Sequence, residues 1–231
     1  MKRKAWLLLF AAMTILAVPA HAQREFLCGF TGFDYVVPAN PGGGPTTPTP
    51  FLANGDGYRA VGFVTSFSPV FTGTLLAGAE HTFYLSNATV AASSFTNNTL
   101  EVLFAPNARL DVYEDPANNA SYGTNPPNGT SPSNFADGTL IIGAAVNSFV
   151  LVYDYDSNQG NFDGSATLDS GSDLFLIPPT RRAGWVMSGQ AGVPNATVPA
   201  GYVNQINGQV EIPSVTPAAH KSWGALKALY R

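Results

Sequence analysis

The sequence predicts an all-β fold, a single antiparallel β-sandwich of the jelly-roll type with long loops rich in Pro, Gly and Asn. Three observations lead to this expectation. Apolar and polar residues alternate with a period of two and not 3.6. Turn residues recur at short intervals, including Asp-Gly pairs at 56–57, 137–138 and 163–164. Phe, Tyr, Val and Thr, which fit a pleated and half-buried surface, are plentiful.

The alternation predicts a series of strands and little helix. The expected strands cover residues 25–33, 58–67, 81–90, 99–105, 109–114, 139–156, 162–168, 174–177 and 202–212. Two segments, 38–50 and 116–134, interrupt the pattern and are typical of long loops. Loops of this length are either functional or plain surface connections, and both interpretations stay open.

The first 22 residues have the layout of a secretory signal peptide. Three basic residues at positions 2–4 precede an apolar run over 5–18, and Ala20-His21-Ala22 supplies the small residues of a cleavage site. The run is shorter than the roughly 20 residues that a bilayer-spanning helix needs. We therefore expect a secreted or cell-surface protein with no transmembrane segment in the mature chain, and a periplasmic location is the alternative.

This interpretation divides the chain into three parts. They are a signal peptide over 1–22, a β-sandwich domain over 23–212, and a proline-containing spacer with a basic amphipathic tail over 213–231. The domain is large enough for one sandwich with its own core.

The charge distribution argues against nucleic acid as a partner. All 15 acidic residues lie between residues 23 and 219, a range that contains five arginines and no lysine. Binding to a phosphate backbone requires clustered cations, and this part of the chain has none.

The chain has a single cysteine, Cys28, so it cannot form an internal disulfide. Stability must therefore come from apolar burial. Cys28 alternates with Phe26 and Phe30, which predicts a small buried side chain. An intermolecular disulfide or a reactive thiol is the alternative.

The stretch VLVYDYDSNQGNFDG, residues 150–164, poses the main chemical question because it concentrates Asp and Asn in a chain poor in charge. If 157–160 form a four-residue hairpin loop, one face of the hairpin is wholly apolar and the other faces solvent. Asp154 and Asp163 then lie opposite each other. Like charges in that position are destabilising unless a cation lies between them.

Calcium would suit this hairpin because it binds six to eight oxygen atoms from carboxylates, amides and water. The candidate ligands are Asp154, Asp156, Asn158, Asn161 and Asp163. The D-x-D-x-N spacing resembles the opening of an EF-hand loop, but Gln159 and Ser165 stand where that loop needs Gly and Glu. A calcium ion at a hairpin tip and a plain turn without metal are the two interpretations, and no cofactor is required.

The sequence singles out no catalytic residue. His81 is the only histidine between residues 23 and 219, and the motifs of serine hydrolases and zinc proteases do not occur. A carboxylate pair of the kind that glycosidases use leaves no local motif. A secreted carbohydrate-active hydrolase with such a pair is therefore the alternative function.

The function we expect is that of an exported, non-catalytic module for extracellular or cell-surface binding, or of a structural component that self-associates. Exported sandwiches with exposed rings and amides resemble carbohydrate-binding modules, so a polysaccharide or a cell-surface component is a candidate partner. The candidate ligand-binding rings lie near Gly, Asn or Pro and are Tyr58, Tyr122, Trp185 and Tyr202. Packing in the core or in turns is the other interpretation of each ring.

The last twelve residues, HKSWGALKALYR, are basic and amphipathic and predict a short helical tail. Trp223, Leu226 and Tyr230 share one face, while Lys227 and Arg231 supply positive charge. The layout resembles the sorting or anchoring tails of some exported bacterial proteins. Alternatively, the tail folds back and covers an edge of the acidic domain.

Overall fold

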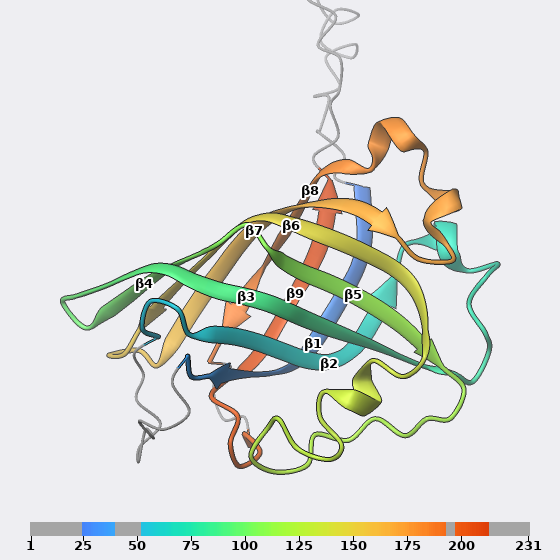
Figure 1. Ribbon diagram of the computed structural model, residues 1–231. Coiled ribbons are helices and arrows are strands. Elements are labelled where there is room, and N and C mark those ends of the chain that lie inside the picture. The colour runs from blue at the N-terminus through green and yellow to red at the C-terminus, as the bar shows by residue number, and fades with distance from the viewer. Residues whose placement is uncertain (1–24, 40–51, 193–196, 213–231) are drawn as a thin grey trace, which may run out of the picture. The chain divides into compact units, whose positions relative to one another are not determined.

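An antiparallel sheet that closes on itself forms the body of the protein in the computed structural model, which describes residues 25–39, 52–192 and 197–212 (Figure 1). The strands are β1 (Glu25–Val37), β2 (Gly57–Phe67), β3 (Glu80–Thr96), β4 (Thr99–Phe104), β5 (Ala108–Asp115), β6 (Thr139–Asp154), β7 (Gln159–Ser170), β8 (Ala183–Ala191) and β9 (Gln205–Ile212). Residues Glu25–Ile212 form one unit.

Helix in the described residues is limited to four short 3-10 turns. They are η1 (Pro69–Phe71), η2 (Ser133–Phe135), η3 (Leu174–Leu176) and η4 (Pro179–Arg181). None of these helices is long and apolar enough to cross a membrane.

Pairing between the first and last strands closes the sheet. Apart from β4 and β5, strands that follow one another in sequence pair in turn, and β1 pairs with β9 from Glu25 to Phe33. Strands β4 and β5 occupy successive stretches of the same position between β3 and β6. The result is an up-and-down barrel with eight strand positions.

The prediction of an all-β antiparallel fold is confirmed, whereas the jelly-roll sandwich is not what the chain forms. A sandwich keeps two sheets apart, but here the β1–β9 pairing joins the two ends of one sheet. Closure leaves the alternation of apolar and polar residues unchanged, because a barrel strand also has one face inside and one outside.

Two strand predictions are wrong. Residues 174–177 contain the 3-10 turn η3 in place of a strand, and β8 is a strand that the sequence did not predict. In β8 the inward side chains of Trp185 and Met187 are buried, but the strand also holds glycines, which weaken the signal of a strand in sequence. The last strand begins at Gln205, after the predicted start at 202.

Large rings and glycines share the barrel interior. At one level of the barrel, Phe30 lies opposite Gly208, Gly208 opposite Gly189, and Gly189 opposite Phe162. The rings of Phe30 and Phe162 stack across the glycines with their centroids 6.2 Å apart. The cavity that remains at the centre is about 10 Å³, scarcely room for one water molecule. The barrel is therefore filled by its own side chains.

Cys28 belongs to this core, as the sequence predicts. The residue is 2% exposed, and burial raises the pKa of its thiol to about 12. A thiol with this pKa is protonated at neutral pH and is a poor nucleophile.

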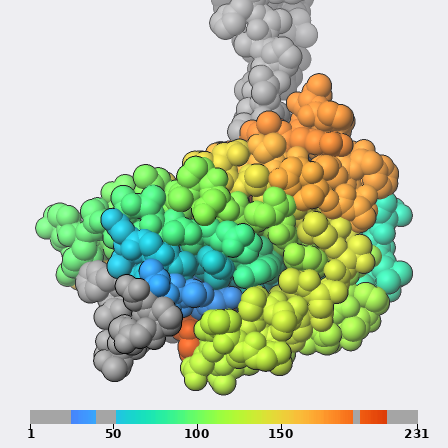
Figure 2. Space-filling view, in the orientation of Figure 1, coloured from blue at the N-terminus to red at the C-terminus, as the bar shows by residue number. Residues whose placement is uncertain are grey.

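The long loop 116–134 has no strand, as predicted, but it packs closely on the outside of the barrel. Figure 2 shows this segment, in yellow-green, as a continuous layer of atoms. Its Tyr122, together with Phe135 and Tyr202, covers apolar side chains on the outer face of β1 and β2, including Tyr35 and Val61. The barrel wall at β1 and β2 therefore has apolar layers on both faces.

We predict that Gly189→Ala lowers the free energy of unfolding by about 1–3 kcal/mol, because the added methyl group overlaps the ring of Phe162 and the carbonyl oxygen of Asn207. Urea unfolding measures the change. Gly73→Ala is the matched control, since no atom lies within 4 Å of its Cβ position and we expect a change below about 0.5 kcal/mol. Equal effects of the two substitutions would contradict the ring-over-glycine packing.

Candidate functional site

The hairpin of β6 and β7 has a different register from the predicted one. Its loop comprises residues 155–158, so Asp154 lies opposite Gln159 and Asp163 lies opposite Val150. The predicted pairing of Asp154 with Asp163 is therefore wrong, although the apolar and polar faces are the predicted ones. No opposed pair of carboxylates exists here to call for a cation.

Three of the five predicted calcium ligands already accept hydrogen bonds from protein groups. Asp154 Oδ1 accepts a hydrogen bond from the Asp156 amide at 2.9 Å, and Asp156 Oδ1 accepts one from Asn98 Nδ2 at 2.8 Å. The oxygen Asn158 Oδ1 accepts the hydroxyl of Tyr153 at 3.0 Å.

The other two, Asn161 and Asp163, lie exposed on the outer face of β7. Within the described residues, no group of three or more His, Cys, Asp or Glu side chains could hold a metal ion. Calcium binding stays a prediction. A higher melting temperature with calcium than with chelator, lost in Asp156→Asn, would support it, and an unchanged melting temperature would remove it.

The four predicted ligand-binding rings are mostly buried, two in the barrel interior and two beneath the outer loops. Tyr58 is 2% exposed, Trp185 1% and Tyr202 7%, while Tyr122 is half-buried. The indole of Trp185 donates to the Arg181 carbonyl at 2.8 Å. The structure brings Tyr122 and Tyr202 together, with ring centroids 5.7 Å apart, but as packing between two loops. A ligand-binding role for these rings is untested, and Tyr58 and Trp185 offer no open face to a sugar.

The tail residues Trp223, Leu226, Lys227, Tyr230 and Arg231 and the signal peptide lie outside the described residues. Their roles in sorting and export stay predictions.

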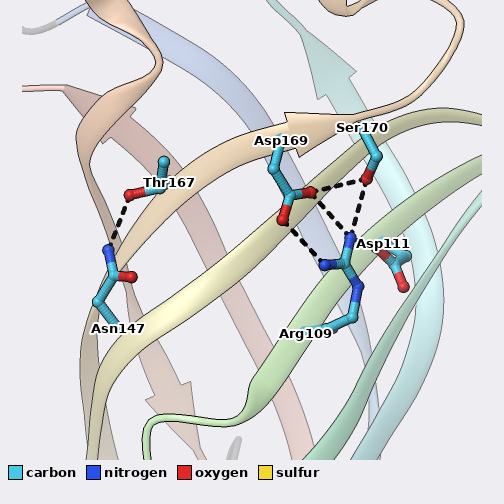
Figure 3. A network of polar contacts seen from close by, with 6 residues as sticks. All are labelled: Arg109, Asp111, Asn147, Thr167, Asp169 and Ser170. Carbon is cyan, nitrogen blue, oxygen red and sulfur yellow. Dashed lines mark hydrogen bonds and ion pairs between the residues drawn. The ribbon is translucent and has the colours of Figure 1, made fainter.

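A polar network on the outer wall joins β5 to β7 (Figure 3). The guanidinium of Arg109 donates two hydrogen bonds of 3.0 Å to Asp169 and one of 3.0 Å to Asp111. It also donates to Ser170 Oγ at 2.9 Å. The group crosses β6 directly above Gly143, where a Cβ would lie 2.8 Å from Arg109 Nη2. The charged side chains of this network are paired with one another, which indicates a structural role.

We predict that Asp169→Asn lowers the free energy of unfolding at pH 7 by about 1 kcal/mol, the upper end for an exposed ion pair. The hydrogen bonds from Arg109 lower the pKa of Asp169. The folded state therefore gains stability from the ionised group above its unfolded pKa of about 3.9, and the gain is lost as the pH falls through the lowered pKa. Thermal unfolding from pH 7 to pH 2 measures this.

Asp163→Asn is the control for this prediction. Asp163 is exposed on the same strand and has no hydrogen bond or ion pair with any described residue. A difference between wild type and Asp169→Asn that does not shrink in acid would contradict the ion-pair interpretation.

Acidic residues at one end of the barrel hold loops in place. Glu114 Oε2 accepts the Leu76 amide at 2.6 Å and contacts His81 Nε2 at 3.1 Å. Glu80 Oε1 accepts the Ala120 amide of the long loop at 2.7 Å. His81 thus sits in a structural contact, with no hydroxyl or thiol nucleophile bonded to it in the described structure.

A row of amides crosses the outer face of three neighbouring strands. Asn161 on β7 lies opposite Gln190 on β8, and Gln190 lies opposite Asn207 on β9. Asn161 and Gln190 are exposed and Asn207 is half-buried. None of the three makes a side-chain hydrogen bond with any other residue of the described chain. We call these three residues the amide row.

Two grooves flank the amide row along β8. The first, of about 480 Å³, is bordered by uncharged residues only: Phe26, Gly29, Phe30, Thr65, Ser66, Ser188, Gly189, Asn207, Gly208 and Gln209. The second, of about 210 Å³, includes Asn161, Gln190 and Gly192, with Asp154 as its one charged residue. The surface is thus rich in neutral donors and acceptors.

The amide row was not among the sites predicted from the sequence. Two of its members lie on strands that the sequence did predict, but Gln190 lies on the missed strand β8. The usable signal was an amide that alternates with small or apolar residues, such as Asn161 between the buried Gly160 and Phe162.

Comparison with known protein families, with characterised proteins and with solved structures gives no match for this chain.

Proposed function

We propose that the protein is an exported, non-catalytic binding module that holds a neutral polysaccharide on the outer face of β7, β8, β9 and β1. The observation that carries this proposal is the amide row, three registered amides whose side chains have no partner in the described structure. Each amide group offers two donors and an acceptor, the combination that hydroxyl groups of a sugar require.

The grooves support a long ligand over a small one. Along β8 the first groove borders Ser188 and Gly189, and the second continues from Gln190 to Gly192. Gly29 presents no side chain at the floor of the larger groove, and Phe26 offers a ring at one border. A chain molecule could therefore follow the strand and meet hydrogen-bonding groups throughout.

Charge selects the class of polysaccharide. The larger groove has no charged side chain and the smaller one has a single carboxylate. A polyanion would gain no ion pair and would meet repulsion from Asp154. A neutral glycan fits this surface better than a charged one.

The alternative, a hydrolase with a carboxylate pair, requires two acids flanking one groove. The larger groove has none and the smaller one only Asp154. The geometry of this face therefore favours binding without hydrolysis.

We predict that Gln190→Ala combined with Asn207→Ala weakens binding to a neutral polysaccharide about tenfold or more, since each lost hydrogen bond contributes about 1 kcal/mol. Affinity electrophoresis in gels containing β-glucan, xylan or dextran measures the retention, with alginate as the polyanionic comparison. The melting temperature should change little, because neither side chain is bonded within the described structure.

Asn147→Ala is the matched control, because this exposed amide lies on β6 and bonds to Thr167 Oγ1 at 2.9 Å. It should leave retention unchanged. Absence of retention on all three neutral polymers, or equal retention of the double variant, would overturn the proposal.

A further inference from the structure

A second cavity, of about 150 Å³, lies at the end of the barrel where β1 ends and β2 begins. Its border includes Asp34 and Tyr58 at the floor, Tyr153 and Tyr155 from the end of β6 and its loop, and Asn204 just before β9. The mouth of a barrel is a common place for a small-molecule site. This cavity shares no residue with the larger groove beside the amide row.

The carboxylate of Asp34 is fully buried and held by neutral donors. Tyr58 donates its hydroxyl to Oδ2 at 2.8 Å. Asn204 donates its backbone amide to Oδ1 at 2.6 Å and its side-chain amide to Oδ2 at 3.2 Å. The exposed fraction of Asp34 is 0%. These bonds fix the carboxylate at the cavity floor.

No cation within the described residues balances this carboxylate. Arg59, next to Tyr58 in sequence, donates instead to the carbonyl oxygens of Tyr58 and Ala88. Burial raises the pKa of Asp34 to about 6, opposed by the hydrogen bonds from Tyr58 and Asn204. At neutral pH the floor of the cavity therefore holds a desolvated negative charge that an opposite charge within about 4–6 Å would stabilise.

The walls of the cavity suit an aromatic or aliphatic body. The rings of Tyr153 and Tyr155 lie with centroids 5.0 Å apart, and Leu151 and Val36 add apolar surface. Phenol rings also attract cations to their faces. A cavity of about 150 Å³ accommodates a group the size of benzene.

We propose that this cavity binds a small organic ammonium ion, a protonated amine on a compact apolar body, with Asp34 as the counter-charge. The amine would lie toward Tyr58 and Asn204, and the apolar body would pack against Tyr153 and Leu151. This ligand differs in class from the polysaccharide proposed for the outer face.

Isothermal titration of the purified protein with benzylamine, benzyl alcohol and benzoate at pH 7.5 tests the charge requirement. We expect benzylamine to bind at least tenfold more tightly than benzyl alcohol, and benzoate to bind most weakly. Equal binding of amine and alcohol, or no binding of the amine, would overturn the proposal.

The pH dependence gives a second readout that needs no variant. Benzylamine stays protonated between pH 7.5 and pH 5, whereas Asp34 takes up a proton as the pH falls through about 6. The affinity for benzylamine should therefore fall about tenfold over this range, because protonation of Asp34 removes the counter-charge. The phenols of Tyr58 and Tyr153 have raised pKa values and stay protonated throughout. An affinity that does not change with pH would assign the binding to another site.

Two substitutions locate the site. Asp34→Asn should remove the preference for amine over alcohol. Val203→Trp should block the cavity without disturbing the core, because Val203 is 41% exposed at its border. Val70→Trp, at a residue that is 43% exposed elsewhere, is the control and should bind benzylamine like wild type. Binding that survives Val203→Trp would place the amine outside this cavity.

Discussion

Two adjacent glycines flanked by two rings across neighbouring strands form the packing constraint on which the barrel depends. An eight-stranded barrel has an interior of limited width, and large side chains cannot point inward from every strand at one level. Here Phe30 and Phe162 fill the space that Gly189 and Gly208 leave open. The strands can therefore curve around the rings and bring β1 beside β9. Closure pairs the first and last strands on both sides, and so removes the free edges through which sheets aggregate.

Because the interior is filled, a ligand cannot bind inside the barrel. The central cavity, about 10 Å³, is too small for a ligand. Binding chemistry is therefore confined to the outer wall and to the ends of the barrel. On the wall, much of the surface is already used, since the long loop covers β1 and β2 and the Arg109 network crosses β6. The amide row and the cavity above Asp34 are polar sites on the surface that these contacts leave uncovered.

The sequence predicts local properties of this fold well and its closure poorly. Alternation identified most strands and the buried Cys28, because these depend on neighbours along the chain. Closure depends on contacts such as Thr31 with the Ile206 carbonyl, 175 residues apart. A sandwich strand and a barrel strand have the same pattern of inside and outside residues, so alternation alone cannot separate the two folds. Pairing of the first with the last strand is the information that a single sequence does not display.

The same limit applies to the sites, as Gly160 illustrates. In sequence Gly160 resembles a turn residue, but it is a buried strand residue beneath Tyr153, and a Cβ there would lie 2.7 Å from the ring. Turn geometry is instead supplied by Asn158 with its φ of 56°. A glycine under a ring and a glycine in a turn are indistinguishable until the register is known. Because that register also decides which amides line up across three strands, a site of this kind becomes visible only when pairing is determined.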